Sequence, residues 1–199
     1  NIRKFIDECS EIIERREKDY FKNIYTEENL RRYIHWDDVA DILNCLDQQT
    51  IKGGDKKEIA RFLESRKNID RQEAKRLKKQ FLDILRDVRR ILPEGVIANS
   101  NFATRTHFLS LFLSIATLYW ERAKVREPDK IRKRLLSFIS NPPEEYIKTV
   151  TGGLRGRTFR EQRVKLLRNE IERSGGILRL DRRRGFSERE RRRLWEKNN

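Results

Sequence analysis

The chain of 199 residues is long enough to bury a core, either as one domain or as two small ones. Its charged fraction of 40% is high and its hydrophobic fraction of 36% is low, but the apolar residues recur at helical spacing, which favours helices with charged outer faces over a disordered chain. The net charge of +15 points to a polyanionic partner, while the lack of a signal peptide and of a charge-free apolar run of about 18 residues argues against a membrane-spanning protein.

The first predicted helix begins at Ile2, where apolar residues recur at i, i+3, i+4 and i+7 as far as Ile13. Thr26 is placed to cap a short helix that runs to Tyr33. A second apolar stripe predicts a further helix that begins after Asp37. The first quarter of the chain is therefore expected to be helical.

The next two predicted helices have clear start signals. Asp55 follows a pair of glycines and is placed to cap one of them. Asp70 and Glu73 form the capping-box pattern D-x-x-E, and Ile69 stands where a hydrophobic staple is found. The helix after this box ends at Pro93, which makes it the most clearly delimited helix of the chain.

Residues 102–120 are hydrophobic nearly all round, a pattern that predicts a central buried helix in a soluble protein. Pro128 suits the first position of the following helix. The Asn-Pro-Pro run at 141–143 ends that helix and can start a brief one through Ile147.

A glycine-rich joint at 152–156 leads to another predicted helix, which closes at Gly175–Gly176. Only residues 177–181 have strand character, and this stretch is too short to change the fold class. The predicted fold is all-α, with a multi-helix bundle over residues 1–151 and a basic, arginine-rich helical extension over residues 152–199.

No catalytic or metal-binding residue is predicted in this chain. The two histidines, His35 and His107, lack a second ligand at metal-binding spacing and are interpreted as packing, capping or pocket residues. The adjacent Asp37 and Asp38 are interpreted as helix-start residues favoured by the helix dipole, in preference to a metal-binding pair. Both cysteines are isolated, as expected of reduced core thiols in a cytoplasmic protein.

The positive charge is concentrated near the C-terminus. Residues 154–199 contain 16 lysines and arginines against 7 aspartates and glutamates, so nine of the fifteen net charges lie there. Nucleic acid is the first candidate partner, with an acidic membrane surface, an acidic protein or a merely solvated basic face as alternatives.

Within this region Arg155, Arg157 and Arg160 follow glycines and are candidate phosphate ligands near a helix N-terminus. The residue order of a P-loop is absent, and a plain hinge between two helical units is the alternative.

The last residues also carry helix signals. Ser187 and Glu190 form a capping box, Phe186 is placed as its staple, and Leu194 and Trp195 follow about two turns later, so this segment is expected to fold as a helix onto another surface. The candidate phosphate-binding residues here are Arg182, Arg183, Arg184, Arg189, Arg191, Arg192 and Arg193. Solvation of these arginines without a ligand is the alternative.

This closing pattern resembles a known family. Arginines followed by Phe–Ser–x–x–x–Arg–Arg–x–Leu–Trp–x–x–Asn over residues 186–198 resemble the helix that leads into HNH endonuclease domains. In that family a Cys-x-x-Cys segment follows and begins the zinc-stabilised ββα nuclease unit. A looser likeness, over residues 102–173, is to the helical region between a ParB-like N-terminal domain and the HNH domain of bacterial restriction and phage-defence nucleases.

The resemblance implies a helical DNA-engaging region whose divalent metal and structural zinc belong to an HNH domain outside these residues, so it assigns no catalytic residue here. A chain that begins with Asn and contains 0 Met is expected to be a piece of a longer protein. The first alternative is a helical protein–protein interaction module with incidental positive charge. The second is a helical RNA-binding domain with Tyr20, Phe21 and Tyr25 as stacking residues. The sequence leaves open whether the chain forms a homo-oligomer.

Overall fold

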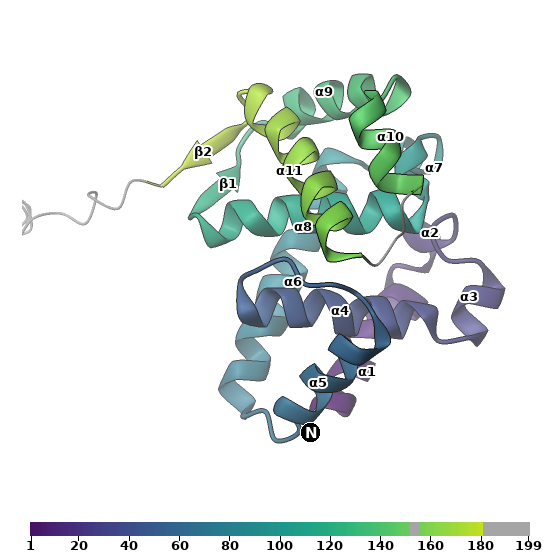
Figure 1. Ribbon diagram of the computed structural model, residues 1–199, viewed down its shortest axis with the longest axis vertical. Coiled ribbons are helices and arrows are strands. Elements are labelled where there is room, and N and C mark those ends of the chain that lie inside the picture. Colours follow the sequence, from purple (N-terminus) through teal and green to yellow (C-terminus); the bar gives the residue numbers. More distant parts are fainter. Residues whose placement is uncertain (152–155, 181–199) are drawn as a thin grey trace, which may run out of the picture.

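The computed structural model describes residues 1–151 and 156–180 (Figure 1). In this part of the chain nearly all regular structure is helical, and one small two-stranded sheet accompanies the helices. The prediction of an all-α, multi-helix bundle is therefore confirmed.

The elements follow the chain without large loops. The N-terminal half contains α1 (Ile2–Glu11), a π-helical turn η1 (Ile12–Arg16), α2 (Lys18–Phe21), α3 (Glu27–Arg31), α4 (Ile34–Gln48), α5 (Lys56–Ser65) and α6 (Arg71–Ile91). The remainder contains α7 (Glu94–Ala98), a 3₁₀ turn η2 (Asn101–Ala103), α8 (Arg105–Trp120), β1 (Ala123–Val125), α9 (Pro128–Ser140), α10 (Glu144–Thr151), α11 (Arg157–Arg173) and β2 (Ile177–Arg179).

Three of the predicted helix caps are confirmed. The Thr26 hydroxyl accepts a hydrogen bond from the backbone N–H of Asn29, and the Asp55 carboxylate accepts one from Glu58. Asp70 accepts from two backbone N–H groups in the first turn of α6. Side chains at these positions satisfy donors that have no partner inside the helix, which fixes where α3, α5 and α6 begin.

Helix α8 runs through the middle of the bundle, with α9, α10 and α11 on one side and α4 and α6 on the other (Figure 1). Every residue from Phe108 to Leu118 is buried. A helix surrounded in this way is apolar on all faces, so the prediction of a central buried helix is confirmed. Its regular part begins at Arg105 instead of Phe102, because the residues before it form the η2 turn.

Helix α11 belongs to the bundle and not to an extension. Its apolar residues Leu167 and Ile171 are fully buried in the same core as α8 and α9. The boundary expected at residue 152 therefore does not separate two cores. High charge density had suggested an extension, but the charged side chains of α11 find partners on neighbouring helices, as described below.

Two further expectations need correction. Helix α4 begins at Ile34, before Asp37, because Tyr33 adopts a left-handed backbone with φ of 53° that interrupts the chain after α3. The predicted strand is present as β2 (Ile177–Arg179), but its antiparallel partner β1 was not expected. A strand of three residues gives too short a pattern to detect, and its pairing partner lies more than 50 positions away.

Candidate nucleic-acid interface

Two of the ten predicted phosphate ligands lie in the described residues, and they differ sharply. Arg157 is exposed at the start of α11, where its Nε lies 2.8 Å from Glu161 Oε1. Arg160 is buried, with 2% of its surface exposed. The other candidates fall outside the residues that the structure describes: Arg155, Arg182, Arg183, Arg184, Arg189, Arg191, Arg192 and Arg193.

Arg160 makes a two-point ion pair with Asp41 of α4. Its Nη1 lies 2.9 Å from Asp41 Oδ1, and its Nη2 lies 2.6 Å from Oδ2. Nη1 also donates to the backbone carbonyl of Lys52 at 3.1 Å. A guanidinium enclosed in this way does not reach a phosphate at the surface, so the assignment of Arg160 as a nucleic-acid ligand is corrected: it ties α11 to α4.

The loop after α4 lies directly on this pair. A Cβ atom at Gly54 would come within 2.6 Å of Asp41 Oδ2 and 3.0 Å of Arg160 Nη1. The pair of glycines before Asp55 thus includes a residue, Gly54, that leaves room for the ion pair. Burial is the largest single influence and opposes the charged form of Arg160. The charge of Asp41 and the hydrogen bond to it, together with the charges of Cys45 and Asp38, outweigh burial and raise the pKa of the guanidinium above its usual value.

A second ion pair, between the buried Asp38 and the partly exposed Arg105, joins α4 to α8. Asp38 accepts from Arg105 Nε at 2.8 Å and from Nη2 at 2.7 Å, in the bidentate geometry that arginine and carboxylate favour. The Tyr25 hydroxyl donates to the same carboxylate at 3.0 Å. Asp37 lies in the first turn of α4, as a helix-start residue should, whereas the reading of Asp38 as a helix-dipole residue is wrong because its carboxylate serves this pair.

Arg163 completes the polar layer between α8, α10 and α11. Its Nε donates to Ser110 Oγ at 3.2 Å, and Nη1 donates to the backbone carbonyl of Thr149. The void left between these groups has a volume of about 10 Å³, which is close to the space that one water molecule needs. The layer therefore connects four helices through polar contacts and leaves no room for a substrate.

His107 lies beside this layer, and its predicted role as a satisfied pocket residue is confirmed. Its Nδ1 is 2.7 Å from the Tyr146 hydroxyl, and the two rings stack with centroids 5.5 Å apart. Burial, with a smaller contribution from the charge of Arg163, lowers the pKa of His107 to about 4. His35 is likewise a packing residue, 2% exposed and flanked by Tyr25 and Tyr33.

The remaining charged residues of α11 are mostly engaged within the bundle. Arg168 pairs with Glu121 and with Glu172, whose Oε1 lies 3.0 Å from Arg168 Nη2. Glu170 is 9% exposed at its side chain and accepts from Arg134 of α9 at 2.5 Å. Lys165 is the one cation of this helix that is exposed and without an ion-pair partner among the described residues. The positive charge of α11 thus stabilises the bundle more than it adds to a basic surface.

Three uncompensated cations, the β1 row, lie instead on β1 and on the residue at each end of it. Arg122, Lys124 and Arg126 are exposed, alternate with the buried Ala123 and Val125, and have no hydrogen-bond or ion-pair partner for their side chains in the described part of the chain. Residues two positions apart in an extended segment share one face, about 6.6 Å apart, which applies to Lys124 and Arg126. Arg122 instead lies in the turn before the strand, with a left-handed backbone of φ 58°. The row was not predicted from the sequence, because its one local signal, the alternation Arg-x-Lys-x-Arg, is too short to identify a strand by itself.

The carboxylates next to this row are already engaged. Glu121 pairs with Arg168, and Glu127 lies 2.8 Å from Lys130 Nζ. These partners hold the pKa of each carboxyl group below its usual value, chiefly through the hydrogen bond from the cation. The β1 row therefore presents its positive charge without a competing free carboxylate beside it.

The aromatic cluster considered for RNA stacking is not available. Tyr20, Phe21 and Tyr25 are each 2% exposed and pack against the core. Base stacking needs an accessible ring face, so this expectation is wrong for these residues. The two cysteines, Cys9 and Cys45, are free and buried as predicted, and burial raises the pKa of their thiols to about 12 and about 11.

Across residues 1–151 and 156–180, no three or more His, Cys, Asp or Glu side chains are grouped so that they could hold a metal ion. In the same residues no helix combines the length and the apolar character needed to cross a membrane. Comparison of the chain with models of protein families, with curated proteins and with solved structures gave no match in any of the three.

Proposed function

We propose that this chain is the helical DNA-engaging region of an HNH-type endonuclease of bacterial restriction or antiviral defence, and that it holds the DNA backbone without reading its sequence. In this proposal phosphodiester hydrolysis belongs to an HNH domain outside these residues, which would bring the divalent metal and the structural zinc. The bundle would then serve as a rigid platform that positions the DNA.

The observation that carries the proposal is the β1 row. Three exposed cations lie within or directly beside β1, Lys124 in the strand and Arg122 and Arg126 at its two ends, and they lack partners in the described residues. The extended spacing of about 6.6 Å between Lys124 and Arg126 corresponds to roughly two nucleotides of axial rise along one DNA strand. Such a group of cations can contact several phosphates of the DNA backbone, which is how non-specific DNA binding obtains most of its free energy.

The sequence adds charge next to this row. β2 pairs with β1 in antiparallel register, Lys124 opposite Leu178 and Ala123 opposite Arg179. Three residues after β2 the chain enters the run Arg182–Arg184, and four further candidate arginines follow. The β1 row and the arginine-rich sequence are therefore joined by only a few residues, and this closeness favours one continuous basic contact.

The proposal is tested by gel-shift titration of the chain with duplex DNA at about 50 mM and about 200 mM salt. Replacement of Arg122, Lys124 and Arg126 by alanine should weaken binding at low salt and reduce the slope of log K against log salt by about 2 to 3, since each lost phosphate contact removes about 0.9. Arg191→Ala/Arg192→Ala/Arg193→Ala should act in the same direction.

A matched control removes the same charge elsewhere. Lys56, Lys57 and Arg61 on α5 are also exposed and have no partner for their side chains among the described residues, so their replacement by alanine lowers the net charge equally. If this α5 variant lost as much affinity for DNA as the β1 variant, the assignment of the DNA-binding site to the β1 row would be wrong. DNA binding would then depend on net charge alone. Metal-dependent cleavage of DNA by these 199 residues alone would contradict the assignment of hydrolysis to another domain.

A second candidate function is a helical protein–protein interaction module. It is favoured by the engagement of the α11 arginines inside the bundle, which leaves this helix with a packing role. If this second function is correct, the gel shift should show negligible DNA binding near physiological salt, both for the wild-type chain and for the β1 and α5 variants.

A further inference from the structure

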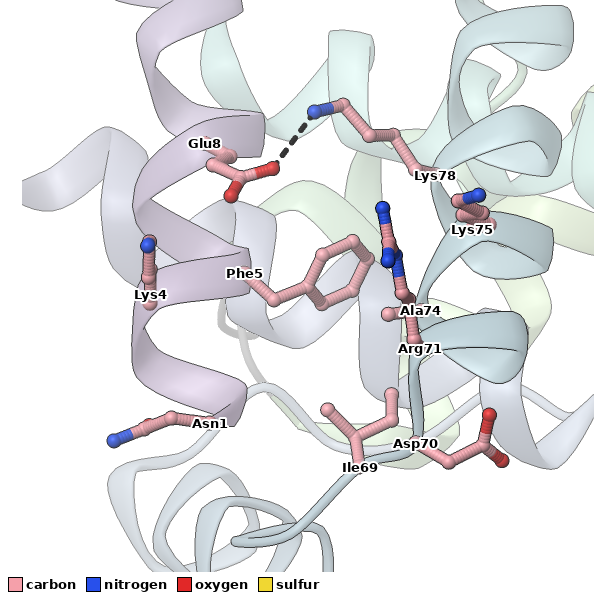
Figure 2. Close-up of a pocket in the computed structure, with 10 residues that line it drawn as sticks. All are labelled: Asn1, Lys4, Phe5, Glu8, Ile69, Asp70, Arg71, Ala74, Lys75 and Lys78. Carbon is pink, nitrogen blue, oxygen red and sulfur yellow. Dashed lines mark hydrogen bonds and ion pairs between the residues drawn. The ribbon is translucent and has the colours of Figure 1, made fainter.

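An open groove of about 490 Å³ lies between α1 and the first turns of α6 (Figure 2). Phe5 points from α1 into the space between the two helices, and Ile69 and Ala74 lie on the α6 side. These three side chains form an apolar floor. The Asp70 carboxylate at one end already caps α6, so the backbone N–H groups of Gln72 and Glu73 are engaged and not available to a ligand.

Cations stand around this floor on both helices. Lys4 belongs to α1, and Arg71 and Lys75 belong to α6. All three are exposed, and their side chains have no hydrogen-bond or ion-pair partner within the part of the chain that the structure describes. Arg71 and Lys75 stand one helical turn apart, about 6 Å along the axis of α6.

The upper end of the groove, as Figure 2 shows it, is closed by an ion pair. Lys78 of α6 donates to Glu8 of α1 at 2.9 Å, and this contact holds the two helices together across the groove. The pair lowers the pKa of the Glu8 carboxyl group, first through the hydrogen bond from Lys78. This ion pair therefore links the two helices that form the walls of the groove, while Lys4, Arg71 and Lys75 remain available to a ligand.

We propose that this groove binds an acidic amphipathic helical segment of a partner protein. Its apolar side chains would cover Phe5, Ile69 and Ala74, and its carboxylates on either side would meet Lys4 on one wall and Arg71 and Lys75 on the other. A helix offers carboxylates at i and i+4 with the same axial spacing as Arg71 and Lys75. Binding of an amphipathic helix in a groove by one apolar face is a general mode of recognition.

A nucleic-acid backbone fits this groove less well than the peptide. Two carboxylates, Glu8 and Asp70, line it together with the cations, and a strand with a phosphate at every nucleotide would bring charge against them. A peptide can place acidic residues only where cations face it. The apolar floor also stabilises leucine-like side chains, which a phosphodiester backbone lacks.

The test uses the full chain and a designed probe. The probe is an acetylated and amidated peptide of about 16 residues, with a leucine stripe flanked by glutamates on both sides, long enough to reach measurable helicity in water. A scrambled peptide of the same composition is its control. Binding is followed by fluorescence anisotropy of the labelled peptides at a fixed, near-physiological salt concentration.

We expect the amphipathic peptide to bind saturably and the scrambled peptide to bind at least about tenfold more weakly, because only the first can present both faces together. Arg71→Glu/Lys75→Glu should lower the affinity for the amphipathic peptide by about tenfold or more through charge repulsion. Lys56→Glu/Lys57→Glu, which makes the same charge change on α5 outside the groove, should change affinity less than about twofold. Circular dichroism of each variant verifies that the bundle has folded.

Three results would overturn the proposal: no saturable binding of the amphipathic peptide, equal binding of the scrambled peptide, or an equal loss in the α5 variant. A gel shift with duplex DNA runs in parallel on the same proteins. If Arg71→Glu/Lys75→Glu abolished DNA binding and left peptide binding unchanged, the groove would be a nucleic-acid site instead. The β1 row is not altered by either variant, so failure of the groove leaves the DNA proposal standing, and the reverse also holds.

Discussion

Arg157 and Arg160 stand one turn apart on α11 and have the same side-chain chemistry, yet their environments are opposite. Arg157 is exposed with one carboxylate four residues away, and Arg160 is 2% exposed with Asp41 and a backbone carbonyl around it. The partner of Arg160 lies 119 positions earlier in the chain, so no local pattern indicates the pair. The sequence therefore identifies two basic residues, but it does not distinguish an exposed arginine that can bind phosphate from a buried arginine that stabilises the fold.

This difference gives a prediction for stability. Arg160→Ala should lower the free energy of unfolding by about 3–5 kcal/mol, because it leaves the buried Asp41 carboxylate without its counter-ion. Arg157→Ala removes an exposed i,i+4 pair that solvent screens, so its effect on stability should be far smaller. Urea denaturation of the two variants measures both values. A similar loss for the two would mean that Arg160 is not enclosed as described.

His107 makes stability depend on pH. Its pKa is about 4 in the folded protein, against 6.5 for an unperturbed histidine, so between these values the unfolded chain binds a proton that the folded chain does not. The contribution of His107 to the free energy of unfolding is fully present above pH 6.5. It decreases as the pH falls towards 4, and it does not change further below that pH. Allowing for the partial exposure of the ring, the loss should be about 2 kcal/mol.

The measurement is urea denaturation at several pH values between about 7 and about 4 for the wild-type chain and for His107→Gln. Burial also lowers the pKa of His35, which adds a further loss of stability as the pH falls. Protonation of carboxylates adds to the change in stability at the acid end of the range. Both contributions are common to the two proteins. The difference between the two curves therefore reports His107, and parallel curves would show that its ring titrates normally.

Individual helices were the most predictable level of this structure. Caps at Thr26, Asp55 and Asp70 involve residues two or three positions apart, so sequence alone located the starts of α3, α5 and α6. The start of α4 was missed because the left-handed conformation of Tyr33 has no residue signal such as glycine or asparagine. Strand β1 was missed because its formation depends on β2, which is distant in the sequence.

The junction between α11 and β2 gives a prediction at the level of elements. A Cβ atom at Gly176 would come within 2.6 Å of Ile131 Cγ1 and 2.7 Å of the Glu127 carbonyl oxygen, while the Gly176 carbonyl accepts from Arg126 and Glu127. Gly176→Ala must push β2 away from α9, at a cost of about 1–3 kcal/mol and several degrees of Tm.

The control for this variant is Gly95→Ala in α7, where nothing lies within 4 Å of the added atom. At that position the substitution should be neutral or raise stability by up to about 1 kcal/mol, because alanine reduces the entropy of the unfolded chain. Thermal unfolding monitored by circular dichroism compares the two. Equal Tm values would show that β2 has room to adjust and that its docking on α9 is loose.

At the scale of the whole molecule, the net charge of +15 has two distinct uses. Cations of α11 and α8 neutralise buried carboxylates and connect the helices of the bundle, while the β1 row and the α1–α6 groove present cations without partners among the described residues. Net charge is a property of the sequence, but its division between these uses appears only once the helices are packed. For this reason the composition favoured a polyanionic partner without locating any contact.

If the chain binds DNA through its backbone, the whole molecule should not distinguish sequences. Two duplexes of equal length and unrelated sequence should bind with affinities within about threefold of each other at any one salt concentration, since phosphates carry no sequence information. Competition gel shifts, with one duplex labelled and the other unlabelled, measure the ratio directly. A preference of about tenfold or more would require contacts to base edges, each worth about 1–3 kcal/mol. Such contacts would point to a reading element other than the β1 row, whose cations are proposed to contact the phosphate backbone alone.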